Sequence, residues 1–143
     1  MPIKSFRGLI ANDSQDTIVL HTIDGSTGYR IVKFVTIPNS PGTTGIESIV
    51  KIYKVNQTTP SVTVDFSDQT LLGVSYYQDD ANVAYPSSQD IIFDGEIFNQ
   101  DIYVTLLQGT GSHPMNYYIE LEQIKLDLNE NTVATLKDIR NVA

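Results

Sequence analysis

The order of apolar and polar residues is dominated by short segments with a period of two. In segments 61–66 and 117–122, apolar side chains at every second position alternate with mainly polar ones. This spacing is that of a half-buried β-strand, whose side chains point alternately to opposite faces. Segments 29–37 and 49–55 are instead apolar at successive positions. Their pattern is typical of central strands, or of strands that are buried in an oligomer interface.

Runs of this kind, separated by turn residues, predict about eight to nine strands. They span residues 4–10, 16–22, 28–37, 46–55, 61–66, 70–77, 91–93, 101–107 and 115–128. Many short strands at regular spacing indicate an all-β antiparallel β-sandwich, with a jelly-roll or an Ig-like topology. The chain shows no internal repeat and no linker, so we expect residues 1–143 to form a single domain.

A helical pattern is limited to the C-terminal segment. Val133, Leu136 and Ile139 are spaced three apart, and Asn131 or Thr132 is a suitable N-cap. A short C-terminal helix and a final strand both fit this segment, and the spacing favours the helix.

The composition is that of a folded protein rather than a disordered one, because 41% of the residues are hydrophobic. The chain contains no cysteine, so neither a disulfide framework nor a thiolate metal site is expected. No apolar run approaches the length of a membrane span, and residues 1–10 lack the apolar core of a signal peptide. We therefore expect no membrane partner, and synthesis in the cytoplasm unless another system exports the chain or packs it into a particle.

Charge is distributed unevenly along the chain, whose formal net charge is −8. Residues 1–54 contain six basic and four acidic side chains, whereas residues 55–124 contain ten acidic side chains and no lysine or arginine. A nucleic-acid partner is not expected, since nucleic-acid binders present basic faces. The acidic middle of the chain is typical of a solvated surface. It also suits a basic partner, including the basic part of a neighbouring copy of the chain.

Residues His21, Asp24 and Ser26 place a histidine, a carboxylate and a hydroxyl within six positions, and these are the groups of a hydrolase triad. A triad normally draws these groups from distant segments, and the nucleophile elbow G-x-S-x-G is absent here. Asp24, Gly25 and Gly28 suit a turn instead, because hairpin turns need positive φ values. We therefore predict a hairpin between the two flanking strands, no catalytic residues and no enzymatic activity.

Polar loops are the remaining candidates for a ligand site. His113 lies in a Gly/Pro-rich loop and lacks the spacing to His21 that makes a metal site recognisable. The acidic segments 79–90 and 94–101 contain three carboxylates each, but neither has the pattern of an EF-hand loop. We therefore expect no bound metal ion and no cofactor.

Tyr76, Tyr77 and Tyr85 flank the longest polar loop. Tyrosine is favoured at interfaces because its ring is apolar while its hydroxyl stays in contact with water. We therefore predict that these three side chains contact a protein partner, or stack on a sugar ring. The alternative is that they cover the end of the core.

Several segments of the chain resemble those of small virion proteins from marine tailed bacteriophages. The segments are IANDSQDTIVLHTIDGSTGYRIVKF, VDFSDQTLLGV, IIFDGEIFNQDIYVT, NYYIELEQIKLDL and TLKDIR, and the likeness runs from about Phe6 to Arg140. Such phages carry small β-rich proteins that decorate or cement the capsid, or that connect the head to the tail. The resemblance implies a non-enzymatic structural protein, located in the virion, that binds the major capsid protein or other virion proteins.

The most specific expectation is a capsid decoration or cement protein that stabilises a tailed-phage head. We expect such a subunit to form a homo-oligomer, and a trimer at a local threefold axis is one arrangement. The alternative is a carbohydrate-binding β-sandwich, or a tail or receptor-binding component. A sugar binder is expected to present a groove with aromatic platforms, whereas a cement protein needs a broad contact of about 800 Å² per partner.

Overall fold

The computed structural model describes residues 2–23, 25–40, 45–79, 87–93 and 95–126. In these residues all the regular structure is β-strand, which confirms the predicted all-β fold. The strands are β1 (Ile3–Ile10), β2 (Ser14–Ile18), β3 (Thr27–Pro38), β4 (Ile46–Tyr53), β5 (Leu71–Asp79), β6 (Ser87–Ile92), β7 (Ile102–Thr110) and β8 (Met115–Lys125). The predicted C-terminal helix lies outside the described residues. A search of the described residues found no helix long and apolar enough to cross a membrane.

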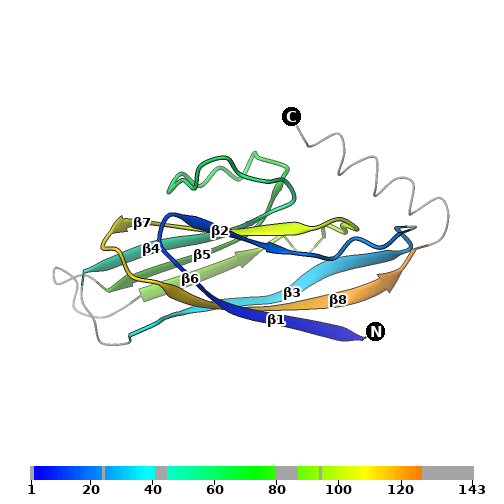
Figure 1. Ribbon diagram of the computed structural model, residues 1–143, viewed down its shortest axis with the longest axis horizontal. Helices are drawn as coiled ribbons and strands as arrows, with labels where there is room; N and C mark the ends of the chain where they lie inside the picture. The colour runs from blue at the N-terminus through cyan, green and yellow to red at the C-terminus, as the bar shows by residue number, and fades with distance from the viewer. Residues whose placement is uncertain (1, 24, 41–44, 80–86, 94, 127–143) are drawn as a thin grey trace.

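The strands form two antiparallel sheets that pack face to face as a sandwich (Figure 1). One sheet has the order β1-β8-β3, and the other has the order β2-β7-β4-β5-β6. The pairs are nested along the chain: β4 pairs with β5, the pair of β2 with β7 encloses them in the sequence, and the pair of β1 with β8 encloses both. Such nesting arises when one long antiparallel hairpin wraps into two sheets, as in a jelly roll. β6 departs from a symmetric arrangement, because it pairs with β5 at the edge of the five-stranded sheet.

Apolar side chains on the inner faces of the two sheets form one core. Phe34 of β3 pairs with Ile119 of β8, and these side chains are 1% and 0% exposed. Across the core, Val50 of β4 pairs with Leu106 of β7, and both are 0% exposed. Burying one such side chain contributes about 1.5–3 kcal/mol to stability. The alternation predicted for segment 117–122 is confirmed, because its odd-numbered side chains are buried.

Polar contacts also link the two sheets, and one of them lies beside β1. The Tyr117 hydroxyl of β8 donates a hydrogen bond to Asp16 Oδ2 of β2 at 3.0 Å, so it links the two sheets. Burial, together with the nearby Asp16 carboxylate, raises the pKa of Tyr117. The ring lies against Gly8 of β1, where an added Cβ would be 2.7 Å from the hydroxyl oxygen. Only a glycine at this position leaves room for the ring.

The connection between β2 and β3 is not the predicted hairpin. β2 pairs with β7 and β3 pairs with β8, so residues 19–26 carry the chain from one sheet to the other. Gly25 has a positive φ of 67°, as predicted, but Gly28 lies within β3. A Cβ on Gly28 would approach the side chains of Ile97 and Leu126 to 3.1 Å. A glycine pair marks a turn or a close approach, and it does not fix which sheet the next strand joins.

Segment 61–66 was predicted to be a strand, and this is wrong. It belongs to an irregular stretch between β4 and β5, and its apolar side chains are 39% to 57% exposed. Asp65 accepts a hydrogen bond from the backbone N–H of Ser67, and Asp68 accepts one from that of Thr70. These local bonds compete with the backbone pairing that a strand requires. The alternating pattern is present, but turn-forming side chains override it.

This irregular stretch lies on the outer face of the five-stranded sheet, away from the three-stranded sheet (Figure 1). Lys51 of β4 points outward there, and its Nζ donates to the Thr63 carbonyl at 2.7 Å. The ammonium also lies 5.3 Å from the centroid of the Tyr53 ring. Burial lowers the pKa of Lys51, which is 1% exposed, although the Asp68 carboxylate opposes this effect. A buried, hydrogen-bonded cation therefore attaches residues 54–70 to the sheet.

We expect Gly8→Ala to destabilise the protein by about 1–3 kcal/mol, because the new Cβ would displace the Tyr117 ring from its contact with Asp16. The measurement is the free energy of unfolding from urea denaturation. Gly109→Ala is the matched control, since a Cβ there would lie 3.8 Å from Glu47, an ordinary contact. Equal stabilities of the two variants would contradict the packing described.

Candidate functional site

The outer surface of the three-stranded sheet is built from side chains that point away from the core. The strand register places them in rows across β1, β8 and β3: Leu9, Asn116 and Ile37; Arg7, Tyr118 and Val35; Ser5, Glu120 and Lys33; Ile3, Glu122 and Arg30. We call this surface the open sheet face. Leu9, Ile37 and Ile3 are 52%, 57% and 53% exposed. Grouped exposure of large aliphatic side chains is typical of a contact surface, whereas isolated exposure is common anywhere.

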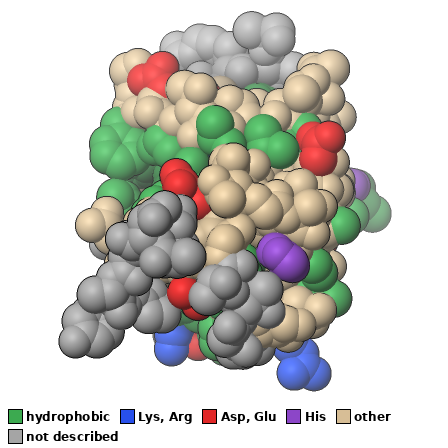
Figure 2. All heavy atoms as spheres, turned by 90° about the vertical axis from the view of Figure 1, so that its left-hand side faces the viewer, with side chains coloured by type: hydrophobic (Ala, Val, Ile, Leu, Met, Phe, Trp, Pro, Cys, Tyr) green, Lys and Arg blue, Asp and Glu red, His purple; other side chains and the backbone are tan. Residues whose placement is uncertain are grey.

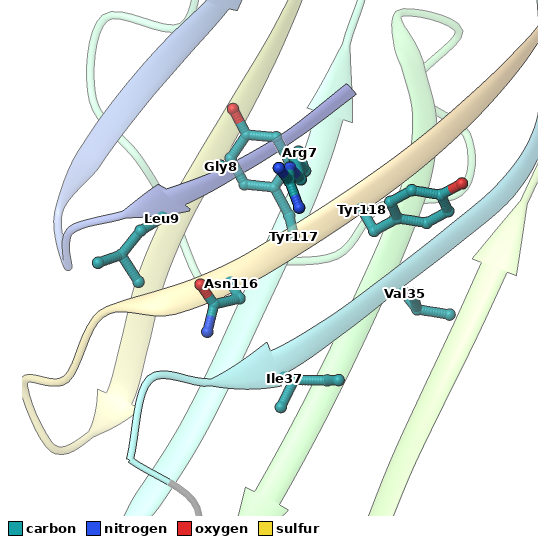
Figure 3. Close-up of a pocket in the computed structure, with 8 residues that line it drawn as sticks. All are labelled: Arg7, Gly8, Leu9, Val35, Ile37, Asn116, Tyr117 and Tyr118. Carbon is teal, nitrogen blue, oxygen red and sulfur yellow. The ribbon is translucent and has the colours of Figure 1, made fainter. Parts of the chain in front are cut away.

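An open depression of about 480 Å³ lies in this face (Figure 3). It is lined by Arg7, Gly8, Leu9, Val35, Ile37, Asn116, Tyr117 and Tyr118. In Figure 3, Leu9 of β1 and Ile37 of β3 lie to either side of Asn116 of β8. The depression therefore has aliphatic side chains at two of its borders and an amide between them.

Tyr118 is held at the edge of this depression by polar contacts. Its hydroxyl donates to Glu120 Oε2 at 2.7 Å, and Lys33 Nζ lies 5.9 Å from its ring centroid. The hydrogen bond to Glu120 raises the pKa of Tyr118. The ring, the carboxylate and the ammonium thus form a connected group on β8 and β3.

The other cations of the open sheet face are arginines. Arg30 Nη2 lies 3.2 Å from Glu122 Oε2, and the Arg30 Nε is buried without a hydrogen-bond partner among the described residues. Arg7 is exposed, and it forms no hydrogen bond or ion pair with any residue that the structure describes. The open sheet face therefore contains three cationic side chains, Arg7, Arg30 and Lys33. It contains two carboxylates, those of Glu120 and Glu122.

This local charge differs from that of the rest of the molecule. Figure 2 shows Lys and Arg side chains at the lower edge, which is the side of the three-stranded sheet in Figure 1. The Asp and Glu side chains that are visible in this view lie mainly above them. The sequence already separates basic residues 1–54 from acidic residues 55–124. The fold turns part of this separation into a basic surface on a protein with a net charge of −8.

The three tyrosines that were predicted to contact a partner do not form one surface in the described residues. Tyr76 and Tyr77 are adjacent in β5, so their side chains point to opposite faces of the five-stranded sheet. Tyr77 packs against the core, and burial raises its pKa, with a smaller effect from Asp79. Tyr85 lies outside the described residues. Their role in partner contact stays a prediction.

Sequence analysis did not identify the open sheet face as a unit. A signal was present in segment 29–37, whose two apolar sides suggested a central strand or an interface strand. The structure places this segment at the edge of the three-stranded sheet, with Phe34 buried and Ile37 exposed. One apolar side therefore serves the core, and the other lies on the surface.

His21 has a carboxylate partner that the sequence did not indicate. Its Nδ1 lies 2.7 Å from Asp101 Oδ1, and the same oxygen accepts the backbone N–H groups of Leu20 and His21 at 2.9 and 3.0 Å. Burial favours a higher pKa for Asp101, but these hydrogen bonds outweigh it and lower the pKa. Asp101 thus anchors the connection between β2 and β3.

The other groups of the supposed triad are placed differently. Asp24 lies outside the described residues, and the carbonyl of Ser26 accepts the backbone N–H of Leu126 at 2.9 Å. The carboxylate beside His21 therefore comes from residue 101 and not from the turn itself. That this turn has no catalytic role stays a prediction.

His113 lies in the turn between β7 and β8. Gln108 holds its backbone: Gln108 Nε2 donates to the His113 carbonyl at 2.7 Å, and Gln108 Oε1 accepts the His113 N–H at 2.7 Å. No cluster of three or more His, Asp or Glu side chains that could hold a metal ion occurs within the described residues.

We expect Asp101→Asn to lower the free energy of unfolding by about 1–3 kcal/mol at pH 7, because the carboxylate accepts three hydrogen bonds. Its folded-state pKa is below the unfolded value of about 3.9, so its contribution is present above that value. The contribution is lost as the pH falls through the folded-state pKa.

Urea denaturation at pH 7 and near pH 3 tests this dependence. The stability difference between the wild type and Asp101→Asn should shrink in acid. Asp13→Asn is a control, because Asp13 is exposed and its carboxylate accepts no hydrogen bond within the described residues. A difference for Asp101→Asn that is the same at both pH values would count against the assigned role.

Comparison of the chain with protein-family models, with curated proteins and with solved structures gave no match. What the chain does is therefore inferred from its own residues and their geometry. Of the surfaces described, the open sheet face combines exposed aliphatic side chains, a depression and a local positive charge.

Proposed function

We propose that the chain is a non-enzymatic structural protein of a virus particle, and specifically a decoration or cement subunit that stabilises a tailed-phage head. The resemblance of its sequence to small virion proteins supports this proposal. The nested strand order supports it by analogy, because jelly rolls occur in viral capsid domains. Lectins and cupins use the same fold, so the main support comes from the open sheet face.

The open sheet face has the properties of a subunit contact. Leu9 and Ile37 expose more than half of their surface beside the depression, and covering them contributes about 25 cal/mol per Å². The backbone under them is hydrogen-bonded across three strands. Little backbone conformational entropy is therefore lost when a partner covers the face.

The charge of the face indicates which partner surface it suits. Arg7, Arg30 and Lys33 favour an acidic patch, and long-range attraction orients a partner before contact. In the particle, such a patch would be on the major capsid protein or on another virion protein. Assembly into a homo-oligomer, for example a trimer at a local threefold axis, is part of the same proposal.

A carbohydrate-binding sandwich, or a tail or receptor-binding component, is the second candidate. The depression favours it in one respect, because Tyr118, Asn116 and Arg7 are all among the residues that line it. An aromatic ring can stack on a sugar, and the amide and guanidinium can bond to its hydroxyls. The aliphatic borders of Leu9 and Ile37 offer a sugar no hydrogen bonds and suit a protein partner better.

We expect particles of the encoding phage to contain the chain in a copy number that matches the major capsid protein or a simple fraction of it. Quantitative mass spectrometry of purified particles measures this number. Absence from the particles would contradict the proposal, and a few copies per particle would favour a tail component instead.

Particles that lack the chain are expected to release their DNA at a lower temperature than complete particles, and added protein should reverse this loss. Arg7→Glu should fail to restore stability, because it places a negative charge at the contact. Gln89→Glu is the control, since it also introduces a glutamate, on exposed β6 of the other sheet. Full restoration by Arg7→Glu would exclude the open sheet face as the contact.

A further inference from the structure

We propose that the open sheet face binds residues 61–68 of a second copy of this chain, so that copies associate head to tail. We call residues 61–68 the acidic loop. This inference rests on the proposed role as a structural subunit, and it names one partner of the face. Four properties of the acidic loop support it: its exposed apolar side chains, its ordered conformation, its negative charge and its position opposite the open sheet face.

The acidic loop presents apolar side chains to solvent. Val62 and Val64 are each 39% exposed, and Phe66 is 57% exposed. Phenylalanine offers a large apolar area, and an exposed aromatic ring that enters a partner's pocket is typical of an interface anchor. Three exposed apolar side chains within five residues form a patch rather than isolated cases.

The acidic loop is held in a defined shape although it is not a strand. The Phe66 ring packs edge-on against the Phe93 ring, with centroids 5.5 Å apart and an interplanar angle of 80°. Lys51 Nζ donates to the Thr63 carbonyl at 2.7 Å. Because the loop is already ordered, binding costs less conformational entropy than the binding of a free segment.

The charges of the two surfaces are complementary. Asp65 and Asp68 lie on either side of Phe66 in the sequence. The buried Lys51 ammonium lies near Asp68, whereas Asp65 is exposed and forms no ion pair within the described residues. The open sheet face contributes Arg7, which is exposed and forms no ion pair with the residues that the structure describes. Two copies with a net charge of −8 repel each other in most orientations. The orientation that places the acidic loop on the open sheet face is the one that local charge favours.

The shapes of the two surfaces also agree. The depression of about 480 Å³ has Leu9 and Ile37 at its borders, which suits one aromatic side chain with its neighbours. Arg7 lines the same depression, so the proposed contact pairs Asp65 with Arg7. The aromatic anchor then supplies most of the affinity, and the ion pair fixes the orientation.

The two surfaces lie on opposite sides of the sandwich (Figure 1). The acidic loop covers the five-stranded sheet, and the open sheet face is the far side of the other sheet. One pair of copies can therefore form only one such contact, and each copy keeps one surface free. A heterologous contact of this kind produces rings or linear chains instead of a closed twofold dimer.

Sedimentation velocity of the purified chain tests the proposal. We expect the mass to increase with concentration beyond that of a dimer, and the association to weaken as salt rises. Arg7→Glu and Asp65→Arg should each lower the association constant by about tenfold or more, because each leaves like charges facing each other. Gln89→Glu and Gln89→Arg, which introduce the same two residue types on exposed β6, should have little effect.

Mixing the two charge variants gives the decisive measurement. Arg7→Glu and Asp65→Arg should be monomeric alone, but an equimolar mixture should associate, because every contact then joins opposite charges. Phe66→Ser, with its fold confirmed by circular dichroism, should be monomeric and should bind only through its intact open sheet face. It should therefore cap the assemblies of the wild type and reduce their mass.

A monomer at every concentration and salt would overturn self-association, and so would a dimer that both charge variants leave unchanged. A mixture of the charge variants that stays monomeric would also overturn it. These failures are distinguishable from failure of the proposed function, because the presence and copy number of the chain in particles are measured independently. A chain that is abundant in particles but monomeric in solution would keep the structural role and lose this contact.

Discussion

The burial of one face of each sheet against the other is the interaction on which the rest of the structure depends. Side chains alternate along a strand, so burying Phe34 and Ile119 fixes the direction of every neighbour in their strands. Tyr118 and Ile37 must then point outward, in register with Leu9 and Arg7. A shift of one residue would exchange the two sets. The open sheet face is therefore a consequence of the same packing that forms the core.

Most of the fold was predictable from the spacing of apolar residues, because burial on one side of a sheet leaves a period of two in the sequence. Segment 117–122 has this pattern and is a strand, whereas segment 61–66 has the same pattern and is not. The difference lies in Asp65 and Asp68, whose side chains satisfy backbone N–H groups locally. A periodic pattern indicates that a segment can form a strand, but it does not show that a neighbouring strand is available to pair with it.

The candidate surface was less predictable than the fold. Its members come from β1, β3 and β8, which are far apart in the sequence and become neighbours only through the nested pairing. The crossover after β2 likewise brings together residues that are distant in the sequence, because His21 contacts the carboxylate of Asp101, 80 residues away. Tyr76 and Tyr77 are adjacent in the sequence and were predicted to share a contact surface. Neighbouring side chains of a strand point to opposite faces of the sheet, so these two lie apart. Surface composition depends on register, which local sequence does not fix.

The pairing of β6 with β5 leaves β8 as the central strand of the three-stranded sheet, with β1 and β3 as its edges. Every row of the open sheet face includes a residue of β8, which spans Met115–Lys125. During translation, the ribosome delivers this strand after all the others that the structure describes. The open sheet face therefore cannot form until β8 has been synthesised, and a nascent chain that ends before Met115 lacks this surface.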